Sequence, residues 1–179
     1  MLYNGGVSIS EATCWTVIRG AAEGVREQRA EFAARYEDVI RAYLGARWRG
    51  SPLVQHLEDA VQDVFLDCFK GALAGADPDR PFRAYLYGIT RNVARRVEHA
   101  RRRGGLQLDS QFETHDGERS LSRIFDEAWA RSLMRQAAAH QQAAANDDRA
   151  VRRVEILRRR FQEGVPIRTM AEEWGVEAA

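Results

Sequence analysis

The residues of this 179-residue chain that are best suited to a chemical role are arginines, which gather in two segments. Residues 80–103 contain eight arginines and a single acid, Glu98, and a second segment, 149–168, contains seven arginines against Glu155 and Glu163. The whole chain nevertheless carries a net charge of only +1. This layout favours a protein that touches a polyanion at two places, because clustered arginines neutralise phosphates. Solvated helix surfaces are the alternative explanation for the charge alone.

Catalytic and metal-binding chemistry finds no support in the sequence. The chain has four histidines, at positions 56, 99, 115 and 140. None has a partner at metal-ligand or triad spacing, and no glycine-rich phosphate loop is present. Cys14 and Cys68 lie far apart in helix-like apolar patterns, so we expect two buried thiols. We therefore expect no enzyme, no metal site, no cofactor and no small-molecule substrate.

The arginines of residues 80–103 must be positioned by helices. An apolar residue recurs at helical spacing in the segments 26–48, 53–73 and 82–103, and each segment is predicted to form one helix. In the last of these the period places the arginines outward. In segment 53–73 the surface opposite the apolar stripe is acidic. With a further helix from Ser10 to Gly24, the fold class is predicted to be all-α.

Two small helical domains joined by a flexible linker are expected. Residues 104–119 are polar and begin with two glycines, so the first domain is predicted to cover 1–103 and the second 120–179. The second domain contains a predicted helix over 149–162. It ends in a helix-turn-helix pattern over 165–176, with most of the second helix absent, so we expect a truncated fragment or an incomplete gene. If the chain ends here naturally, we expect the second domain to hold DNA only through the arginines of 149–168 and Trp174 to lack its covering partner. No apolar run is long enough for a membrane span and the N-terminus lacks a secretory pattern, so we expect a cytoplasmic protein with no membrane contact.

Two runs in this order, EDAVQDVFL at residues 58–66 and FRAYLYGITRNVARR at residues 82–96, resemble the most recognisable segments of extracytoplasmic-function RNA polymerase sigma factors. The resemblance covers residues 26–103 well and residues 149–176 moderately. It implies a factor that directs promoter recognition, promoter melting and transcription initiation. Core RNA polymerase and promoter DNA are the implied partners, and an anti-sigma protein is a candidate third partner.

The resemblance also implies roles for individual residues. The acidic helix is similar to the one that docks on the clamp of the largest polymerase subunit. The implied polymerase-binding residues are Glu58, Asp59, Gln62, Asp63 and Leu66. Carboxylates on a rigid helix suit a basic partner and steer its approach.

The arginine-rich helix is similar to the family's promoter-melting and minus-ten-reading element. We expect phosphate contacts from Arg80, Arg83, Arg91, Arg95, Arg96, Arg101, Arg102, Arg103 and, in the second domain, Arg168. Asn92 is expected to read a base edge, and Tyr85 or Tyr87 to stack on an unpaired base held near the loop 75–81, although core packing is an equal alternative for both tyrosines. A helix-turn-helix regulator that acts without polymerase is the alternative function, but it would leave the acidic helix unexplained.

Overall fold

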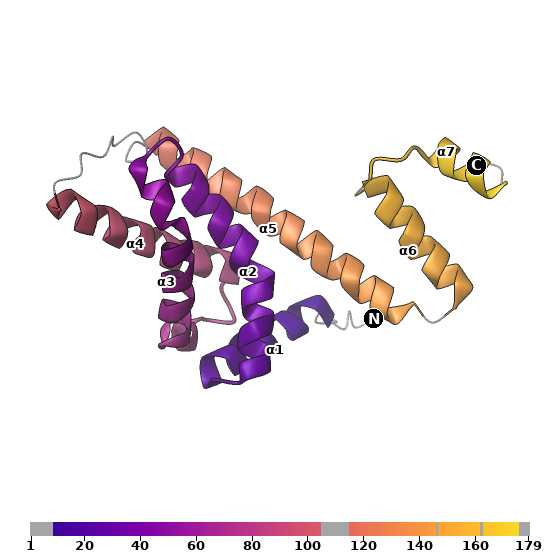
Figure 1. Ribbon diagram of the computed structural model, residues 1–179. Helices are drawn as coiled ribbons and strands as arrows, with labels where there is room; N and C mark the ends of the chain where they lie inside the picture. The colour runs from indigo at the N-terminus through magenta and orange to yellow at the C-terminus, as the bar shows by residue number, and fades with distance from the viewer. Residues whose placement is uncertain (1–8, 105–114, 146, 162, 176–179) are drawn as a thin grey trace, which may run out of the picture. The chain divides into compact units, whose positions relative to one another are not determined.

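The computed structural model describes residues 9–104, 115–145, 147–161 and 163–175 of the chain. Seven α-helices and two short 3-10 helices, and no strand, make up the secondary structure of these ranges (Figure 1). In chain order they are α1 (Ile9–Glu23), α2 (Arg26–Arg47), η1 (Pro52–His56), α3 (Leu57–Phe69), η2 (Ala72–Gly75), α4 (Phe82–Arg103), α5 (His115–Ala144), α6 (Asp148–Phe161) and α7 (Ile167–Trp174). The prediction of an all-α protein is confirmed.

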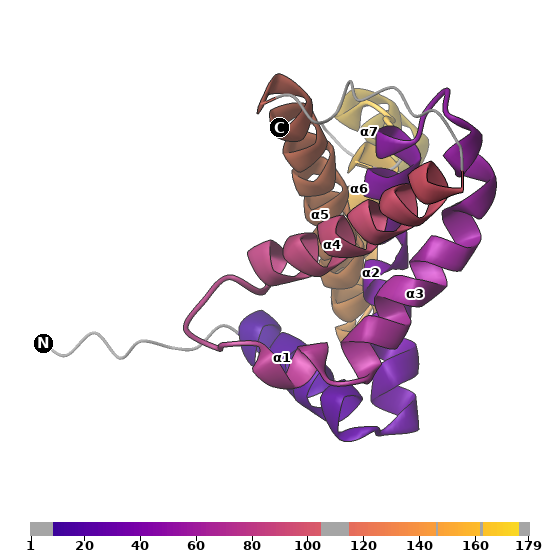
Figure 2. The ribbon, with the colours of Figure 1, turned by 90° about the vertical axis from the view of Figure 1, so that its left-hand side faces the viewer.

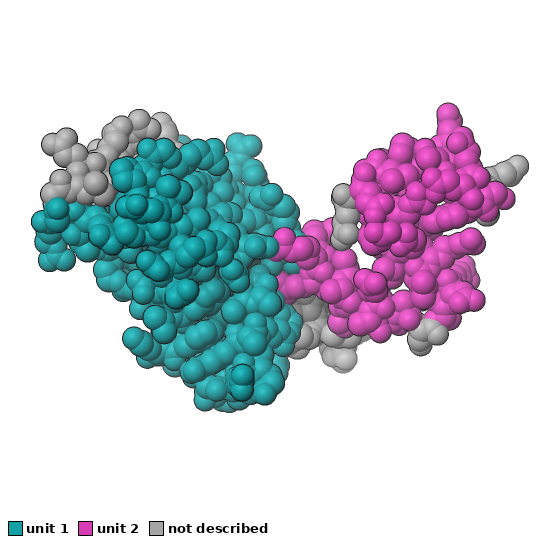
Figure 3. All heavy atoms as spheres, in the orientation of Figure 1, with its two compact units in different colours: residues 1–132 teal, residues 133–179 magenta. Residues whose placement is uncertain are grey.

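The chain forms two compact units, residues 1–132 and 133–179, so the division falls inside α5 (Figure 3). The sequence had suggested a linker over 104–119 and a second domain from residue 120. Residues 105–114 of that expected linker lie outside the described residues, and residues 115–119 belong to α5. The boundary differs because Leu121, Phe125 and Ala128 of α5 are buried in the core of the first unit.

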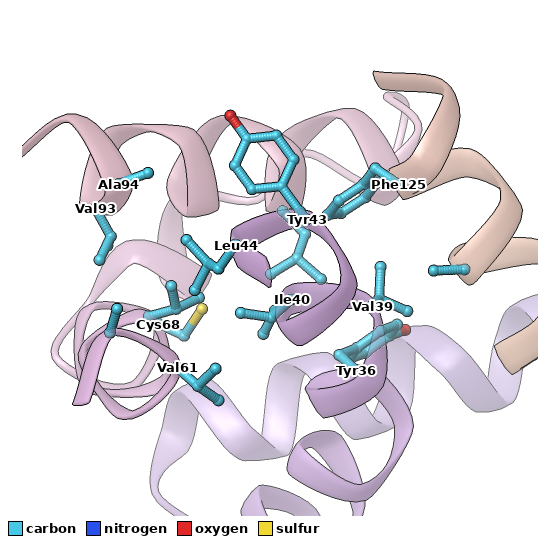
Figure 4. Close-up of a cluster of buried hydrophobic side chains, with 14 of the residues drawn as sticks. Tyr36, Val39, Ile40, Tyr43, Leu44, Val61, Cys68, Val93, Ala94 and Phe125 are labelled. Carbon is cyan, nitrogen blue, oxygen red and sulfur yellow. The ribbon is translucent and has the colours of Figure 1, made fainter. Parts of the chain in front are cut away.

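The core of the first unit is built around α2, which packs against α1, α3 and α4 (Figures 1 and 2). Val39, Ile40 and Leu44 occupy its centre and are completely buried (Figure 4). Each such side chain contributes about 1.5–3 kcal/mol by leaving water. Phe125 reaches this core from α5, with its ring centroid 6.2 Å from that of Tyr43. The first half of α5 is therefore an integral part of the unit.

The single helix predicted over residues 53–73 is divided into three pieces, η1, α3 and η2. Pro52 opens η1, and the Ser51 hydroxyl accepts a hydrogen bond from the Leu53 amide at 3.2 Å. At the other end, Gly71 adopts a φ of 133°, a value outside the helical range that a residue with a side chain rarely adopts. The turn chemistry at both ends therefore overrides the continuous apolar pattern.

The second unit contains the contact between α6 and α7. Asp147 precedes α6 and its carboxylate accepts a hydrogen bond from the Ala150 amide at 2.6 Å, which satisfies a free donor of the first turn. Met170 and Ala171 of α7 are buried, and the helix ends at Gly175, which has a φ of 62°. Among the helices that the structure describes, none has both the length and the apolar character needed to cross a bilayer.

The ring of Trp174 is covered by two arginines of the second unit. The guanidinium carbons of Arg152 and Arg159 lie 5.3 Å and 5.7 Å from its ring centroid, and the side chain is half-buried. Cation–π contacts of this kind are worth about 0.5–1 kcal/mol at exposed sites. Two arginines of the second basic segment thus cover this ring, and they are less free for phosphates than their sequence position indicated.

Candidate nucleic-acid interface

The arginine-rich helix α4 is anchored by an inward stripe. Leu86, Val93 and Ala94 are completely buried, and Thr90 satisfies its buried hydroxyl by donating to the Leu86 carbonyl at 2.9 Å. Because an α-helix repeats every 3.6 residues, this stripe turns most of the other positions outward. Among the expected DNA-binding residues, those exposed on α4 are Asn92, Arg95, Arg96, Arg101 and Arg103, and Arg102 is half-buried.

Glu98, the single acid of the basic segment, lies inside the unit. Its carboxylate accepts hydrogen bonds from Arg47 Nε at 2.6 Å, from Arg47 Nη2 at 3.0 Å and from Trp48 Nε1 at 2.9 Å. The Arg47 side chain is only 2% exposed. A buried charge of this kind is tolerated only when it is paired and hydrogen-bonded. Pairing with Arg47 removes the one negative charge from the outer surface of α4.

Glu118 of α5 forms ion pairs with several basic side chains, including Arg47. Its carboxylate lies 3.1 Å from Arg91 Nε, 3.7 Å from Arg95 Nη2 and 3.3 Å from Arg47 Nη1, and it accepts a hydrogen bond from the Tyr87 hydroxyl at 3.2 Å. Partial burial acts to raise the pKa of Glu118, but the charges of Arg91 and Arg47 and the two hydrogen bonds outweigh it. The net effect is a lowered pKa, so the carboxylate is charged at neutral pH.

Arg83, in the first turn of α4, is also engaged by α5. Its guanidinium forms an ion pair with Asp126 and donates to the Ser122 hydroxyl at 3.0 Å. The same group lies 5.6 Å from the ring centroids of both Tyr87 and Phe125. Arg83 is therefore held within the unit by four neighbours, and its charge is already neutralised there.

Further partners come from α3 and η1. Arg96 pairs with Asp67 at 2.9 Å, although 55% of its side chain is exposed. Arg101 lies 3.4 Å from a ring nitrogen of His56. The Arg96–Asp67 ion pair and the Arg101–His56 contact are both exposed, and an exposed ion pair contributes little and exchanges readily with a stronger polyanion. These two arginines thus stay accessible to a phosphate.

An open pocket of about 510 Å³ lies where the loop 75–81 meets the start of α4. It is lined by Trp15, Gly75, Ala76, Asp77, Arg80, Pro81, Phe82, Ala84 and Tyr85. The loop is shaped by Asp77, whose carboxylate accepts a hydrogen bond from the Asp79 amide at 2.9 Å. Arg80 is 84% exposed and its Nε lies 3.5 Å from Asp77 Oδ2. Aromatic walls with a cation and a carboxylate at the rim suit a flat ring that bears polar edges.

The two tyrosines expected near this pocket have different surroundings. Tyr85 lines the pocket, and its hydroxyl donates to the Ala72 carbonyl. Tyr87 packs edge-to-face against Tyr43 and Phe125, each at 5.3 Å between ring centroids. Burial raises the pKa of the Tyr87 hydroxyl, with Glu118 adding to the effect. The packing interpretation therefore describes Tyr87 best, whereas Tyr85 borders open space.

The acidic surface of α3 is only partly free. Asp59, Gln62 and Leu66 are exposed, and Asp63 is half-buried beside a hollow of about 280 Å³ between α3 and the end of α4. Glu58 forms an ion pair with Arg41 of α2, and this hydrogen bond holds the pKa of Glu58 below its ordinary value. Leu66 is 48% exposed, which places an apolar side chain among the acids. Such a mixed surface is typical of a site for a protein partner.

Arg168 is exposed on α7 in the second unit. On α6, Arg158 pairs with Glu155 at 2.7 Å, and Arg159 pairs with Glu173 at 2.6 Å. The second basic segment is thus partly neutralised within its own unit.

Sequence reasoning assigned no role to three acids and one aromatic residue that contact α4 or belong to its inward side. Glu98 falls on the inward stripe of α4, a signal that was available in its spacing. Glu118 and Asp126 were hidden because nothing in their local pattern shows which helix they meet. Trp15 gave no signal of its pocket position. In the described part of the chain no group of three or more histidine, cysteine or acidic side chains is arranged to hold a metal ion.

Part of the first unit matches a known protein family. Residues 32–105 match the model of sigma-70 region 2. The match spans most of α2 and all of η1, α3, η2 and α4, which carry both the acidic surface and the basic helix. It supports a sigma-70 family factor that binds RNA polymerase and acts in transcription initiation, and such a factor is not an enzyme. No curated protein and no solved structure matches the chain.

Proposed function

We propose that the chain is a sigma-70 family factor of the extracytoplasmic-function kind and that it directs both recognition and melting of a promoter. In this proposal residues 1–132 bind the polymerase clamp and the minus-ten element, and the second unit contributes backbone contacts through Arg168. The supporting observation is that α3 and α4, both inside the matched region, present an acidic surface and a basic surface on one rigid unit. Its place of action is the cytoplasm.

The polymerase contact is assigned to α3. Asp59, Gln62 and Asp63 offer carboxylates and an amide on successive turns, and Leu66 offers an apolar anchor. Glu58 would have to exchange its Arg41 partner for one on the polymerase. A basic helical surface on the clamp complements this arrangement in charge and in shape.

Promoter contact is assigned to α4 and the pocket at its start. The accessible arginines Arg95, Arg96 and Arg101, together with Arg102 and Arg103, supply phosphate affinity that falls with salt, and Asn92 is free to pair with a base edge. Arg83 and Arg91 are expected to add less than the sequence suggested, because α5 already neutralises them. A base that leaves the duplex is held in the pocket beside Tyr85, so melting is driven by capture of the unpaired base.

Co-purification with bacterial core RNA polymerase tests this proposal. We expect the wild-type chain to be retained and the Asp63→Arg variant to be lost, because the reversal places a cation against a basic partner. Glu127→Arg is the matched control: it is the same reversal on an exposed position of α5, outside the proposed surface.

Two outcomes would contradict the assignment. Equal retention of Asp63→Arg and Glu127→Arg would remove α3 from the polymerase contact. A wild-type chain that shifts duplex DNA but is not retained by core polymerase would favour a regulator that acts alone.

A further inference from the structure

The pocket at the start of α4 has one wall that comes from outside the region matched to sigma-70 region 2. Trp15 belongs to α1, and α1 precedes residue 32, where the match begins. Its indole is half-buried, with its ring centroid 5.9 Å from that of Phe82 and an angle of 71° between the two ring planes. Phe82 therefore holds Trp15 in place by an edge-to-face contact, while the indole borders the pocket.

We propose that Trp15 is a base-stacking residue of this pocket, so that α1 takes part in holding an unpaired nucleobase. The inference rests on the proposed function, in which the pocket receives a base from the melted promoter. It adds a residue and a helix that the family's matched region does not contain.

The arrangement of the pocket supports a stacking role. Phe82 contacts both Trp15 and Tyr85, with its ring centroid 5.9 Å and 6.3 Å from theirs, and all three rings line the pocket. The Tyr85 hydroxyl is fixed by its hydrogen bond to the Ala72 carbonyl. Tryptophan gives the largest aromatic surface for stacking, and every base offers a π-face, so the contact is tolerant of sequence.

The rim of the pocket supplies the polar part of base recognition. The Arg80–Asp77 ion pair is exposed and exchanges readily, so Arg80 can meet the phosphate of the captured nucleotide while the Asp77 carboxylate accepts from an exocyclic amino group. The volume of about 510 Å³ lies within the range of roughly 300–1,000 Å³ typical of small-ligand pockets. A single nucleotide therefore has both space and chemically matched walls.

The test uses the full chain bound to core RNA polymerase and two probes of equal length. One probe is single-stranded DNA of mixed sequence, and the other is the same phosphodiester backbone with abasic positions. Trp15→Leu keeps apolar bulk but loses the stacking surface, and Trp15→Phe keeps an aromatic ring. We expect Trp15→Leu to weaken binding of the base-carrying probe by about 5- to 150-fold, Trp15→Phe to weaken it less, and neither to change binding of the abasic probe.

The outcomes separate the inference from the function on which it rests. Equal affinity of wild type and Trp15→Leu for the base-carrying probe overturns the stacking role alone. A loss that is equal on both probes also overturns it, because the tryptophan then acts only through the fold. A wild-type chain that does not bind core polymerase, or does not prefer bases to the abasic backbone, overturns the proposed function together with the inference.

Discussion

Replacement of Glu98 by glutamine is expected to destabilise the first unit strongly. The substitution keeps the shape of the side chain but removes the charge that three donors share. Arg47, with 2% of its side chain exposed, would keep a hydrogen bond to the Tyr43 hydroxyl at 3.3 Å but, among the ion pairs described, only the longer one to Glu118 at 3.3 Å. Breaking a buried ion pair from one side costs about 3–5 kcal/mol. Because glutamine still offers one acceptor oxygen, we expect the lower end, about 3 kcal/mol.

Urea unfolding followed by far-ultraviolet circular dichroism measures this loss. A decrease of about 3 kcal/mol is a large part of the roughly 5–15 kcal/mol that stabilises a typical domain. Glu127→Gln on α5 is the matched control, since its carboxylate makes only an exposed pair with Arg123 among the ion pairs described. That control should change the free energy of unfolding by less than about 0.5 kcal/mol.

A companion variant separates the cost of a broken pair from the value of the intact pair. Arg47→Met combined with Glu98→Leu removes both charges but leaves the buried Trp48 Nε1 donor without its acceptor. Because apolar replacements of buried pairs are often neutral and an unpaired donor has its own cost, the free energy of unfolding should fall by about 1–2 kcal/mol, less than for Glu98→Gln. The reasoning would be refuted by a loss below about 1 kcal/mol for Glu98→Gln alone, because the charge would then be solvated rather than buried.

Two further predictions concern titratable groups. The pKa of Glu118 is lowered in the folded state, so its contribution is present above the unfolded value of about 4.3 and is lost as the pH falls through the folded value. The difference in unfolding free energy between wild type and Glu118→Gln should therefore shrink below about pH 4.5; urea titrations from pH 7 to 3 measure it, and a constant difference would contradict the ion-pair account. Burial, with a smaller effect from Asp67, raises the pKa of Cys68 to about 12. In a Cys14→Ser background, iodoacetamide should label Cys68 at least about 100-fold more slowly in the native protein than in urea, and comparable rates would show that the thiol is accessible.

Helix positions were largely predictable from the sequence, because they follow from local chemistry. The apolar period predicted α4 over 82–103, and the structure places it at Phe82–Arg103. The gap between the segments predicted over 26–48 and 53–73, which holds Gly50, Ser51 and Pro52, follows the end of α2 at Arg47. The break at Gly71 was missed, since an apolar stripe continues across it and the sequence does not show which glycine takes a positive φ.

Contacts between distant segments could not be predicted in the same way. The outward direction of Arg83 and Arg91 was inferred from helical period alone, but both meet acids of α5, 27 or more residues away. Leu121 and Phe125 are apolar residues at helical spacing, but their spacing does not show which core they join. Pairing of this kind depends on tertiary geometry, which a single sequence specifies only through the whole fold.

The position of Phe125 in the core has a consequence for synthesis of the protein. A chain that has emerged only through α4 still lacks the aromatic neighbour that covers Tyr43 and Tyr87. At elongation rates of about 5–20 residues per second, the 29 residues from Gly104 to Ser132 take roughly 1–6 s to add. During that interval the nascent unit exposes both an apolar surface and unpaired arginines. Synthesis of the first half of α5 therefore sets the time at which the nascent domain can complete its core and cover this apolar surface.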